Sequence, residues 1–544
     1  MRTGIICPGE GLRAWQRKSV DLVAKLDFVE LCLVIVDGDA IAEAGPQRGS
    51  LANRLRRSLT PGPLRFVGLT ESLSTVPTAA LLDGQAASAL VRELAIDVVI
   101  CFSPRPVPGN LVSAPTFGVW QHCIGAGADG GGDPPCLEEI REERHIVEIR
   151  LLRLTGKDCG GEILKEAAVQ TVKRSYRATL AAAVSAAAHL PAQVCIEIKR
   201  LGKPILPARR FAIERRGKHA PMARRAVSAM GKMLKHRIRW LAHGVSMSEE
   251  WTLGIVDRPV AGCLEDDFLR EPRFIPTDKA HYLADGFGLV LDGRNFVLCE
   301  QFDYAAGRGA IAWLELDSDG RVLAGPTQAF NTTAHASYPY LFSHCARVFC
   351  CPETWESGSL SLWEAVNPPA VWRCRGKILA GVPAVDPVIF RHGGLWWLFC
   401  SREDDQPNEK LYGWYAEGLA GPWWPHELNP LKIDVRSARS AGAPFLSDGL
   451  LYRPAQDCSR AYGTRISINR VTQLSPSYFS EEVVKVIDPP RTGRFQDGIH
   501  TIAPLGDVCL IDARRWQLSP RGLRLKIRKL LAPRSSQRHP AFRS

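Results

Sequence analysis

The hydrophobic pattern divides the chain into an α/β half and an all-β half. In the first 190 residues, short apolar runs at 4–7, 31–36 and 97–102 alternate with helical segments at about 12–25 and 87–95. Strands that alternate with helices are typical of a parallel, doubly wound sheet. We therefore expect residues 1–196 to form an α/β domain, with any ligand beyond the carboxyl ends of its strands.

From residue 246 onward the pattern changes to a strand, a tight turn and a second strand. The clearest copy is VPAVDPVIFRHGGLWWLFCSR at residues 382–402, with its turn at His392-Gly393-Gly394. Four further copies begin near residues 284, 337, 441 and 499. Five units about 40 to 60 residues apart are spaced like propeller blades. The sequence predicts an all-β five-bladed propeller over residues 246–516, a closed ring with few exposed strand edges.

Two strongly basic segments accompany these domains: a linker and helix at residues 197–245 and a tail at 517–544. Residues 199–239 carry 14 Lys/Arg against Glu214, a net +13, and residues 513–544 carry 10 and no acid, a net +10. Since the whole chain is +12, the remainder is 12 − 23 = −11. Such segments act either as solubilising connections or as contacts for anionic lipid headgroups or phosphorylated glycans. They lack interleaved aromatic residues, so no nucleic acid partner is expected.

Residues 222–243 could form a cationic amphipathic helix, which either connects the domains or lies on a membrane surface. The chain has no run of 18 apolar residues, and its first residues turn polar too early for a signal peptide. Its sixteen Cys have no regular spacing, which favours reduced thiols. We expect a cytoplasmic protein, peripheral to a membrane if the basic segments bind one.

The propeller half contains acids and bases at corresponding positions of the repeat. Glycoside chemistry needs two carboxylates that face each other across the bond, one protonated and one ionised. Forked Arg side chains suit carboxylate or phosphate groups. The candidate catalytic residues are Asp285, Asp386, Glu353 and Asp457, and the candidate binding residues are Glu300, Arg436, Arg439, Arg453 and His500. The alternative is that these groups pair with one another and hold the blades together.

Residues 1–195 resemble the formyltransferase-like domain of methionyl-tRNA and sugar N-formyltransferases. The resemblance rests on Pro108-Gly109, on Gly118-Val119-Trp120 and on the strand at residues 160–164. That family uses an Asn-x-His pair and a later Asp; here the matching positions are Gln121, Cys123 and Cys159. The resemblance therefore implies a domain that has lost formyl transfer. Two alternatives are a shifted site that uses His122 or Asp158, and metal or redox chemistry at Cys123 and Cys159.

Residues 246–516 resemble the amino-terminal, glycosidase-like domain of plant glucosamine inositolphosphorylceramide transferases and its bacterial relatives. The matching segments are residues 284–287, 300–304, 352–354, 385–386, 421–423, 426–430, 436–439 and 451–457. One departure is Gly286, where the family has Pro. The resemblance implies a five-bladed propeller related to furanosidase-type glycoside hydrolases.

Together these features predict a carbohydrate-active protein of surface-glycan or glycolipid assembly that binds a sugar or a sugar phosphate. Asp285 would be base or nucleophile, Glu353 or Asp457 the acid, and Asp386 a group that tunes the acid. One alternative is an amino-sugar N-formyltransferase with an altered site, which would use 10-formyltetrahydrofolate. Another is a non-catalytic glycan-binding protein. No other cofactor and no metal ion is expected.

Overall fold

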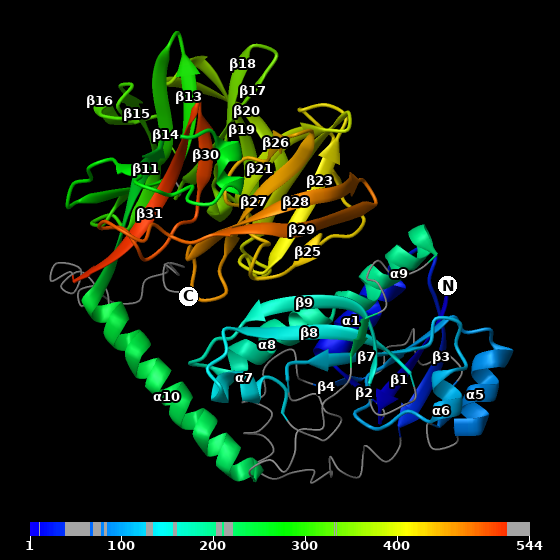
Figure 1. Ribbon diagram of the computed structural model, residues 1–544. Helices are drawn as coiled ribbons and strands as arrows, with labels where there is room; N and C mark the ends of the chain where they lie inside the picture. Colours follow the sequence, from blue (N-terminus) through cyan, green and yellow to red (C-terminus); the bar gives the residue numbers. More distant parts are fainter. Residues whose placement is uncertain are drawn as a thin grey trace. The chain divides into compact units, whose positions relative to one another are not determined.

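The chain folds into two compact units, Met1–Arg237 and Ile238–Ser544 (Figure 1). The computed structural model describes residues 1–9, 11–37, 66–68, 78–80, 84–126, 134–155, 160–202, 209–211, 221–330, 332 and 335–518. The division between the units falls within the long helix α10 (Met222–Ser246). The boundaries predicted at residues 196, 245 and 516 stay predictions.

The first unit is built on an eight-stranded sheet with the order β10-β9-β8-β7-β6-β1-β3-β5. The strands are β1 (Arg2–Pro8), β3 (Glu30–Asp37), β5 (Thr78–Ala80), β6 (Val98–Cys101), β7 (Val119–Ile124), β8 (Ile146–Leu154), β9 (Gly161–Gln170) and β10 (Arg209–Phe211). The run from β5 to β7 is parallel, as predicted. The prediction is wrong for β8, β9 and β10, which pair antiparallel. β8 and β9 follow each other too closely in the chain for a parallel crossover. A two-stranded sheet joins β2 (Gly11–Arg13) and β4 (Phe66–Gly68).

The helices of this unit are α1 (Ala14–Ala24), α5 (Gly84–Glu93), α6 (Gly109–Val112), α7 (Leu137–Arg141), α8 (Tyr176–Ala187) and α9 (Leu190–Leu201). α8 packs on β7, β8 and β9, and α9 packs on β9 and α1. Among the described residues, one helical segment, Tyr176–Leu201, has the length and hydropathy of a membrane span. Of its apolar window, 83% is buried inside the protein, as in the core helix of a globular domain.

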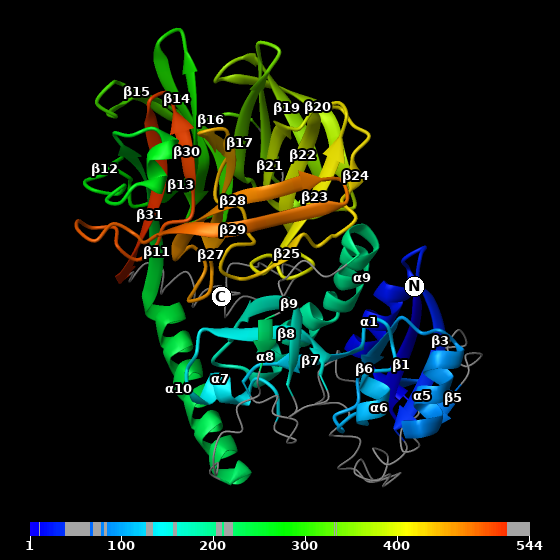
Figure 2. The ribbon, with the colours of Figure 1, turned by 45° about the vertical axis from the view of Figure 1, so that its right-hand side comes forward.

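The second unit is a five-bladed all-β propeller, which confirms the predicted architecture (Figure 2). Its strands are β11 (Met247–Val256), β12 (Arg273–Phe274), β13 (His281–Leu291), β14 (Arg294–Asp303), β15 (Arg308–Leu316), β16 (Val322–Gln328), β17 (Ser337–His344), β18 (Arg347–Glu353), β19 (Ser359–Asn367), β20 (Val371–Ala380), β21 (Ala384–His392), β22 (Leu395–Arg402), β23 (Lys410–Ala416), β24 (Trp424–Pro425), β25 (Lys432–Ile433), β26 (Phe445–Ser447), β27 (Leu450–Asp457), β28 (Arg465–Ser475), β29 (Tyr478–Ile487), β30 (Ile502–Leu505) and β31 (Val508–Leu518). Short 3-10 helices cover Val260–Leu264 and Trp355–Ser357.

One blade combines the two ends of this unit and closes the ring. β11, at the start, pairs antiparallel with β31, at the end, from Met247 opposite Leu518 to Val256 opposite Cys509. The other blades are β13–β16, β17–β20, β21–β24 with β25, and β26–β29. Closure by long-range pairing leaves no free edge between the first and last blades.

The innermost strands of three successive blades share a bulge at the same place. The pairing of β13, β17 and β21 with their neighbours shifts register around Asp285, Tyr338 and Asp386. These three residues have φ of 53°, 44° and 46°, in the left-handed region that non-glycine residues rarely adopt. A bulge bends a strand and redirects one side chain. The Asp-Gly, Tyr-Pro and Asp-Pro pairs of the repeat are the sequence mark of this bulge.

Candidate functional site

The bulges surround a buried cluster of acids. The carboxylates come from four blades: Asp512 on β31, Asp285 and Glu300 on β13 and β14, Glu353 on β18, and Asp386 on β21. Each of these residues is at most 6% exposed. A group of acids this deeply buried must be protonated or matched by cations, because an unpaired charge is costly away from water.

Carboxylates of this cluster accept hydrogen bonds from the backbone N–H groups of the bulges in the next blade. The backbone N–H of Asp285 donates to Asp512 Oδ2 at 3.1 Å, and that of Tyr338 donates to Asp285 Oδ2 at 3.2 Å. The N–H of Asp386 donates to Glu353 Oε2 at 2.9 Å. The expectation that acids hold neighbouring blades together therefore describes one part of what these side chains do.

His500 bridges two of the acids. Its Nδ1 lies 2.7 Å from Asp512 Oδ2 and its Nε2 lies 3.3 Å from Asp285 Oδ1. The Thr501 hydroxyl also donates to Asp285 Oδ1, at 2.8 Å. Burial alone would lower the pKa of His500, but the carboxylates of Asp512 and Asp285 outweigh burial and raise it. His500 is therefore the cation that matches Asp512.

Arg439, whose side chain is 12% exposed, is the second cation of the cluster. Its Nε donates to Asp386 Oδ2 at 2.5 Å, and its Nη1 donates to Asn408 Oδ1 at 3.1 Å. Gln456 Nε2 donates to the same Asp386 oxygen at 2.8 Å. The guanidinium also lies over the ring of Tyr462, 4.6 Å from its centroid. Asp386 is thus held by two side-chain donors and is matched by one positive charge.

The remaining acids differ in protonation. Burial raises the pKa of Asp285 to about 6, although His500 opposes this change. Burial, together with the charge of Asp285, raises the pKa of Glu300 well above its usual range.

Glu353 and Asp512 differ in the same way. Burial and the charge of Asp386 raise the pKa of Glu353 well above its usual range, against the effect of Arg439. Burial also acts on Asp512, but His500 overcomes it and lowers the pKa of that carboxyl. Protonated and ionised carboxyl groups therefore occur side by side.

Three of these groups also lie close enough together to be compared with a metal site. Asp285, His500 and Asp512 place one ligand atom each within 4.8 Å of one another. In the structure, however, both ring nitrogens of His500 face carboxylate oxygens. Carboxylates on both sides favour a protonated imidazole, which has no free lone pair for a metal ion. The geometry does not fit a metal centre as it stands.

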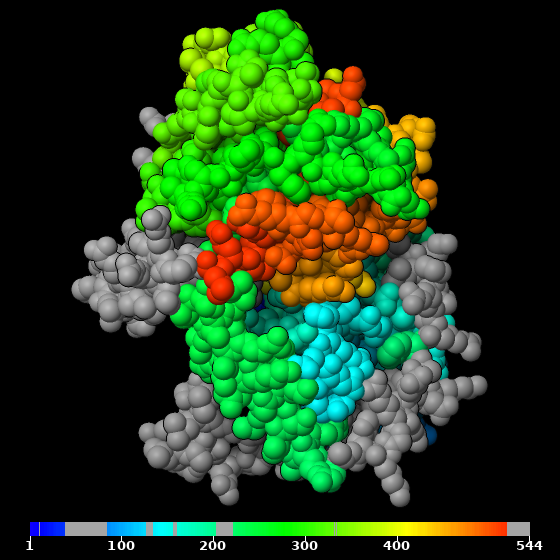
Figure 3. All heavy atoms as spheres, turned by 60° about the vertical axis from the view of Figure 1, so that its left-hand side comes forward, coloured from blue at the N-terminus to red at the C-terminus, as the bar shows by residue number. Residues whose placement is uncertain are grey.

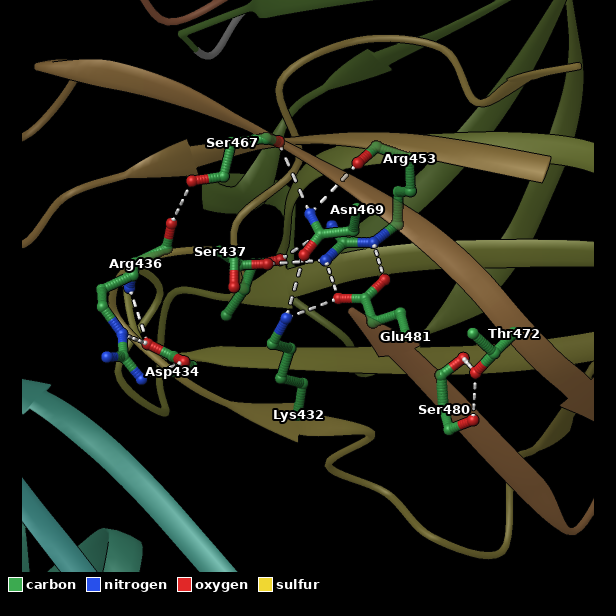
Figure 4. Close-up of polar contacts among 11 residues, drawn as sticks. Lys432, Asp434, Arg436, Ser437, Arg453, Ser467, Asn469, Thr472, Ser480 and Glu481 are labelled. Atoms are coloured by element: carbon green, nitrogen blue, oxygen red, sulfur yellow. Dashed lines mark hydrogen bonds and ion pairs between the residues drawn. The ribbon is translucent and has the colours of Figure 1, made fainter. Parts of the chain in front are cut away.

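The structure brings six predicted site residues together: Asp285, Glu300, Glu353, Asp386, Arg439 and His500. It gives three others separate partners. Arg453 forms a buried pair with Glu481, with Nε to Oε2 at 2.8 Å, and donates to the carbonyl of Ser437 (Figure 4). Lys432 joins the same carboxylate at 2.8 Å. This network joins β27 and β29 to β25 of the neighbouring blade, so Arg453 serves packing between the two blades.

Arg436 and Asp457 also have other partners. Arg436 pairs with Asp434 two residues away, at 2.8 Å, and nearly half of its side chain is exposed (Figure 4). Asp457 accepts a bond from Arg465 Nη2 at 2.5 Å and from the Ser459 N–H at 2.9 Å. Their place at strand ends or in the connecting loop was visible in the sequence, but not the neighbour that would neutralise each charge.

In the first unit, the candidate residues lie on β7. Gln121 Nε2 donates to the carbonyl of Ser103 at 3.1 Å, and Cys123 is buried beside Leu152 and Ile163. His122 packs against Trp15 and Phe102 and contacts the Ala187 carbonyl at 3.1 Å. Burial lowers the pKa of His122 to about 4. Cys159 and Asp158 lie outside the described residues.

The cluster contains residues that sequence reasoning missed: Asp512, Thr501, Gln456, Tyr338 and Tyr462. Asp512 had a signal, since it is an acid inside the apolar run Leu510-Ile511-Asp512-Ala513. Tyr338 had a weaker one, because it occupies the repeat position that holds Asp in two other blades. Gln456 had one in its place within the matching segment 451–457, whereas Tyr462 had none, since its role depends on where Arg439 lies.

Comparisons with known proteins match the propeller. The family model of "Glucosamine inositolphosphorylceramide transferase 1, N-terminal" matches residues 274–499. The Glucosamine inositolphosphorylceramide transferase 1 of Arabidopsis thaliana is 32% identical over 221 residues, 40% of this chain. The chain spans only 29% of the length of that relative.

Solved structures align with parts of the chain at low identity. A thermostable family-43 glycoside hydrolase aligns with 40% of this chain and 78% of its own, at 14% identity and a TM-score of 0.29. A phosphoribosylglycinamide formyltransferase from Anaplasma phagocytophilum aligns with 37% of this chain and 88% of its own, at 17% identity and a TM-score of 0.25.

Proposed function

We propose that the propeller binds a sugar or a sugar phosphate and acts on it in the assembly of a glycolipid or surface glycan. The observation that supports this proposal most directly is the convergence of Asp285, Glu353 and Asp386 from three blades. The family match over residues 274–499, which includes Asp285 and Arg439, and the 32% identity to a glucosamine inositolphosphorylceramide transferase support the substrate class.

The protonation of the three acids suits glycosyl chemistry, which needs a proton donor and an ionised partner. Glu353, whose pKa burial raises well above its usual range, is the proposed acid. Asp285, with a pKa of about 6, is the proposed base or nucleophile and is ionised above that pH. Asp386 lies between Glu353 and Arg439 and is the proposed group that tunes the acid.

A binding titration of the full chain with sugars, sugar phosphates and nucleotide sugars tests the proposal. We expect at least one class to bind, and Glu353→Gln to abolish turnover while it retains binding. Asp457→Asn is the matched variant, because Arg465 rather than the cluster neutralises that acid. Loss of turnover in Asp457→Asn alone would assign the acid to Asp457. A wild-type chain that binds none of these compounds would refute the proposal.

We propose further that the first unit is a formyltransferase-like scaffold without formyl transfer. Gln121 donates to a backbone carbonyl, and His122 packs between two aromatic rings with a pKa of about 4. Neither is arranged as a base for an amine at neutral pH. Incubation with 10-formyltetrahydrofolate and amino sugars should give no formylated product. Turnover that disappears in Cys123→Ala would contradict this and favour the N-formyltransferase alternative.

A further inference from the structure

The part of helix α10 that belongs to the first unit packs on that unit through the polar face of the helix. With 3.6 residues per turn, positions 225, 229, 232 and 236 share one side of the helix. Arg225 forms a buried pair with Glu138, at 2.8 Å from Nε to Oε1, and Glu143 accepts from Lys232 at 2.9 Å and from His236 at 2.6 Å. Two apolar residues add contacts on this side: Ala229, packed with Leu137 and Ile140, and the partly buried Met233.

The opposite side of α10 is apolar and exposed. It consists of Val227, Met230, Leu234, Ile238, Leu241 and Val245, which follow each other at intervals of three or four residues. We call these six side chains the α10 stripe; each is between 42% and 68% exposed. Figure 3 shows the outer surface of this helix uncovered along its length. A surface helix normally buries its apolar side and exposes its polar one, so α10 has the reverse arrangement.

The charges beside the α10 stripe are all positive. The helix carries six Lys/Arg and no Asp or Glu. Arg224, Arg237 and Arg239 are exposed, and none of them forms an ion pair with another described residue. Arg224 and Arg237 flank the stripe on its two sides. An apolar stripe between cations matches the boundary of an anionic bilayer, where acyl chains lie beneath negative headgroups.

We propose that α10 docks on an anionic lipid surface through the α10 stripe, with Arg224 and Arg237 at the headgroups. The helix lies parallel to the surface and does not span it. The inference does not rest on the proposed sugar site, because it uses no residue of the propeller cluster. A second copy of this chain could also cover an apolar stripe, but two copies would bring the unpaired cations together.

The test compares cosedimentation of the full chain with vesicles of phosphatidylcholine alone and of phosphatidylcholine with phosphatidylserine. The stripe variant is Leu234→Gln/Ile238→Gln, which keeps good helix formers at exposed positions. The control is Leu323→Gln/Leu446→Gln on the propeller, where the exposures of 62% and 64% match those of 60% and 58% in the stripe. All basic segments are identical in the three proteins, so the ratio of their vesicle affinities isolates the contribution of the α10 stripe.

We expect the stripe variant to bind the anionic vesicles at least about tenfold more weakly, since acyl burial of two aliphatic side chains is lost. The control should bind like the wild type, and the wild type should prefer the anionic vesicles. Equal binding by stripe variant and wild type would overturn the proposal. So would a wild-type dimer in sedimentation velocity that the stripe variant converts to a monomer, because the occupant would then be a second copy.

Discussion

Two neighbouring acids of the cluster, Asp386 and Glu353, differ in charge. Asp386 and Glu353 are neighbours, yet Asp386 is matched by Arg439, whereas burial keeps a proton on Glu353. Replacing a protonated carboxyl by an amide changes the stability of the protein little. Neutralising Asp386, by contrast, leaves Arg439 without its closest counter-charge. An asparagine would keep the shape of Asp386 and most of its hydrogen bonding, but the pair with Arg439 makes the loss of the charge destabilising.

We therefore predict that two similar acid-to-amide substitutions differ in their effect on the free energy of unfolding. Glu353→Gln should change the free energy of unfolding by less than about 0.5 kcal/mol, because an amide oxygen can still accept the Asp386 N–H. Asp386→Asn should lower it by roughly 2–3 kcal/mol, as expected when a buried pair loses one charge. Urea unfolding at neutral pH measures both. Equal losses would mean that Glu353 is ionised in the folded protein.

Asp285 should make stability depend on pH. Its pKa is about 6 in the folded protein, above the value of about 3.9 of an unfolded chain, so folding favours its protonated form. The stabilisation is complete below the unfolded pKa and is lost as pH rises through about 6. Asp285→Asn should therefore remove a decrease in stability between about pH 4 and pH 6. Parallel pH profiles for the two proteins would show that His500 already cancels the effect of burial.

At the scale of the element, the bulged inner strands position the cluster. The three bulges place two Asp and one Tyr side chain at equivalent points, each in the left-handed region. Such backbone strain persists only where the surroundings hold it, and here a carboxylate accepts each bulge N–H. The fourth blade has Gly442 near the corresponding place, with φ of 136°.

Gly442 lies where the packing between blades leaves no room for a side chain. A Cβ there would lie 1.9 Å from the backbone carbonyl oxygen of Ile502 in the next blade. Gly442→Ala should cost about 3 kcal/mol or more, from the clash and the unfavourable φ together. Gly449→Ala is the control, since it has positive φ but open space around its Cβ, and should cost only about 1 kcal/mol. Equal urea midpoints would show that the blades can separate at this point.

The repeat predicted these elements well because each blade is local in sequence. A strand, a turn and a strand within about 20 residues leave a period-2 pattern that can be recognised in the chain. The partners within the cluster are not local: Asp285 and Asp512 are 227 residues apart, and Arg453 pairs with Glu481 across a blade. Which Arg meets which acid depends on packing, so the sequence placed Arg439, Arg436 and Arg453 together although only Arg439 joins the cluster.

At the scale of the whole molecule, the last strand of the propeller and most of the basic tail occupy separate parts of the chain. β31 is an inner member of the closing blade and carries Asp512, whereas eight of the ten basic residues in 513–544 come after it. The other two, Arg514 and Arg515, are used within the propeller: Arg514 donates to the Tyr462 carbonyl and Arg515 pairs with Glu250. Removal of residues 506–544 and removal of 519–544 should therefore have different consequences.

Removal of residues 506–544 should abolish cooperative unfolding of the propeller, because β11 loses its partner along its whole length and the ring opens. Removal of residues 519–544 spares β31 and should leave the urea midpoint unchanged. It takes away eight positive charges, each worth roughly 1 kcal/mol near an anionic bilayer before salt screens it. Binding to phosphatidylserine vesicles at low salt should fall, while the ratio between the wild-type and stripe-variant affinities should persist. If the shorter chain binds these vesicles unchanged at low salt, the tail has no role at the membrane and α10 must account for the attraction alone.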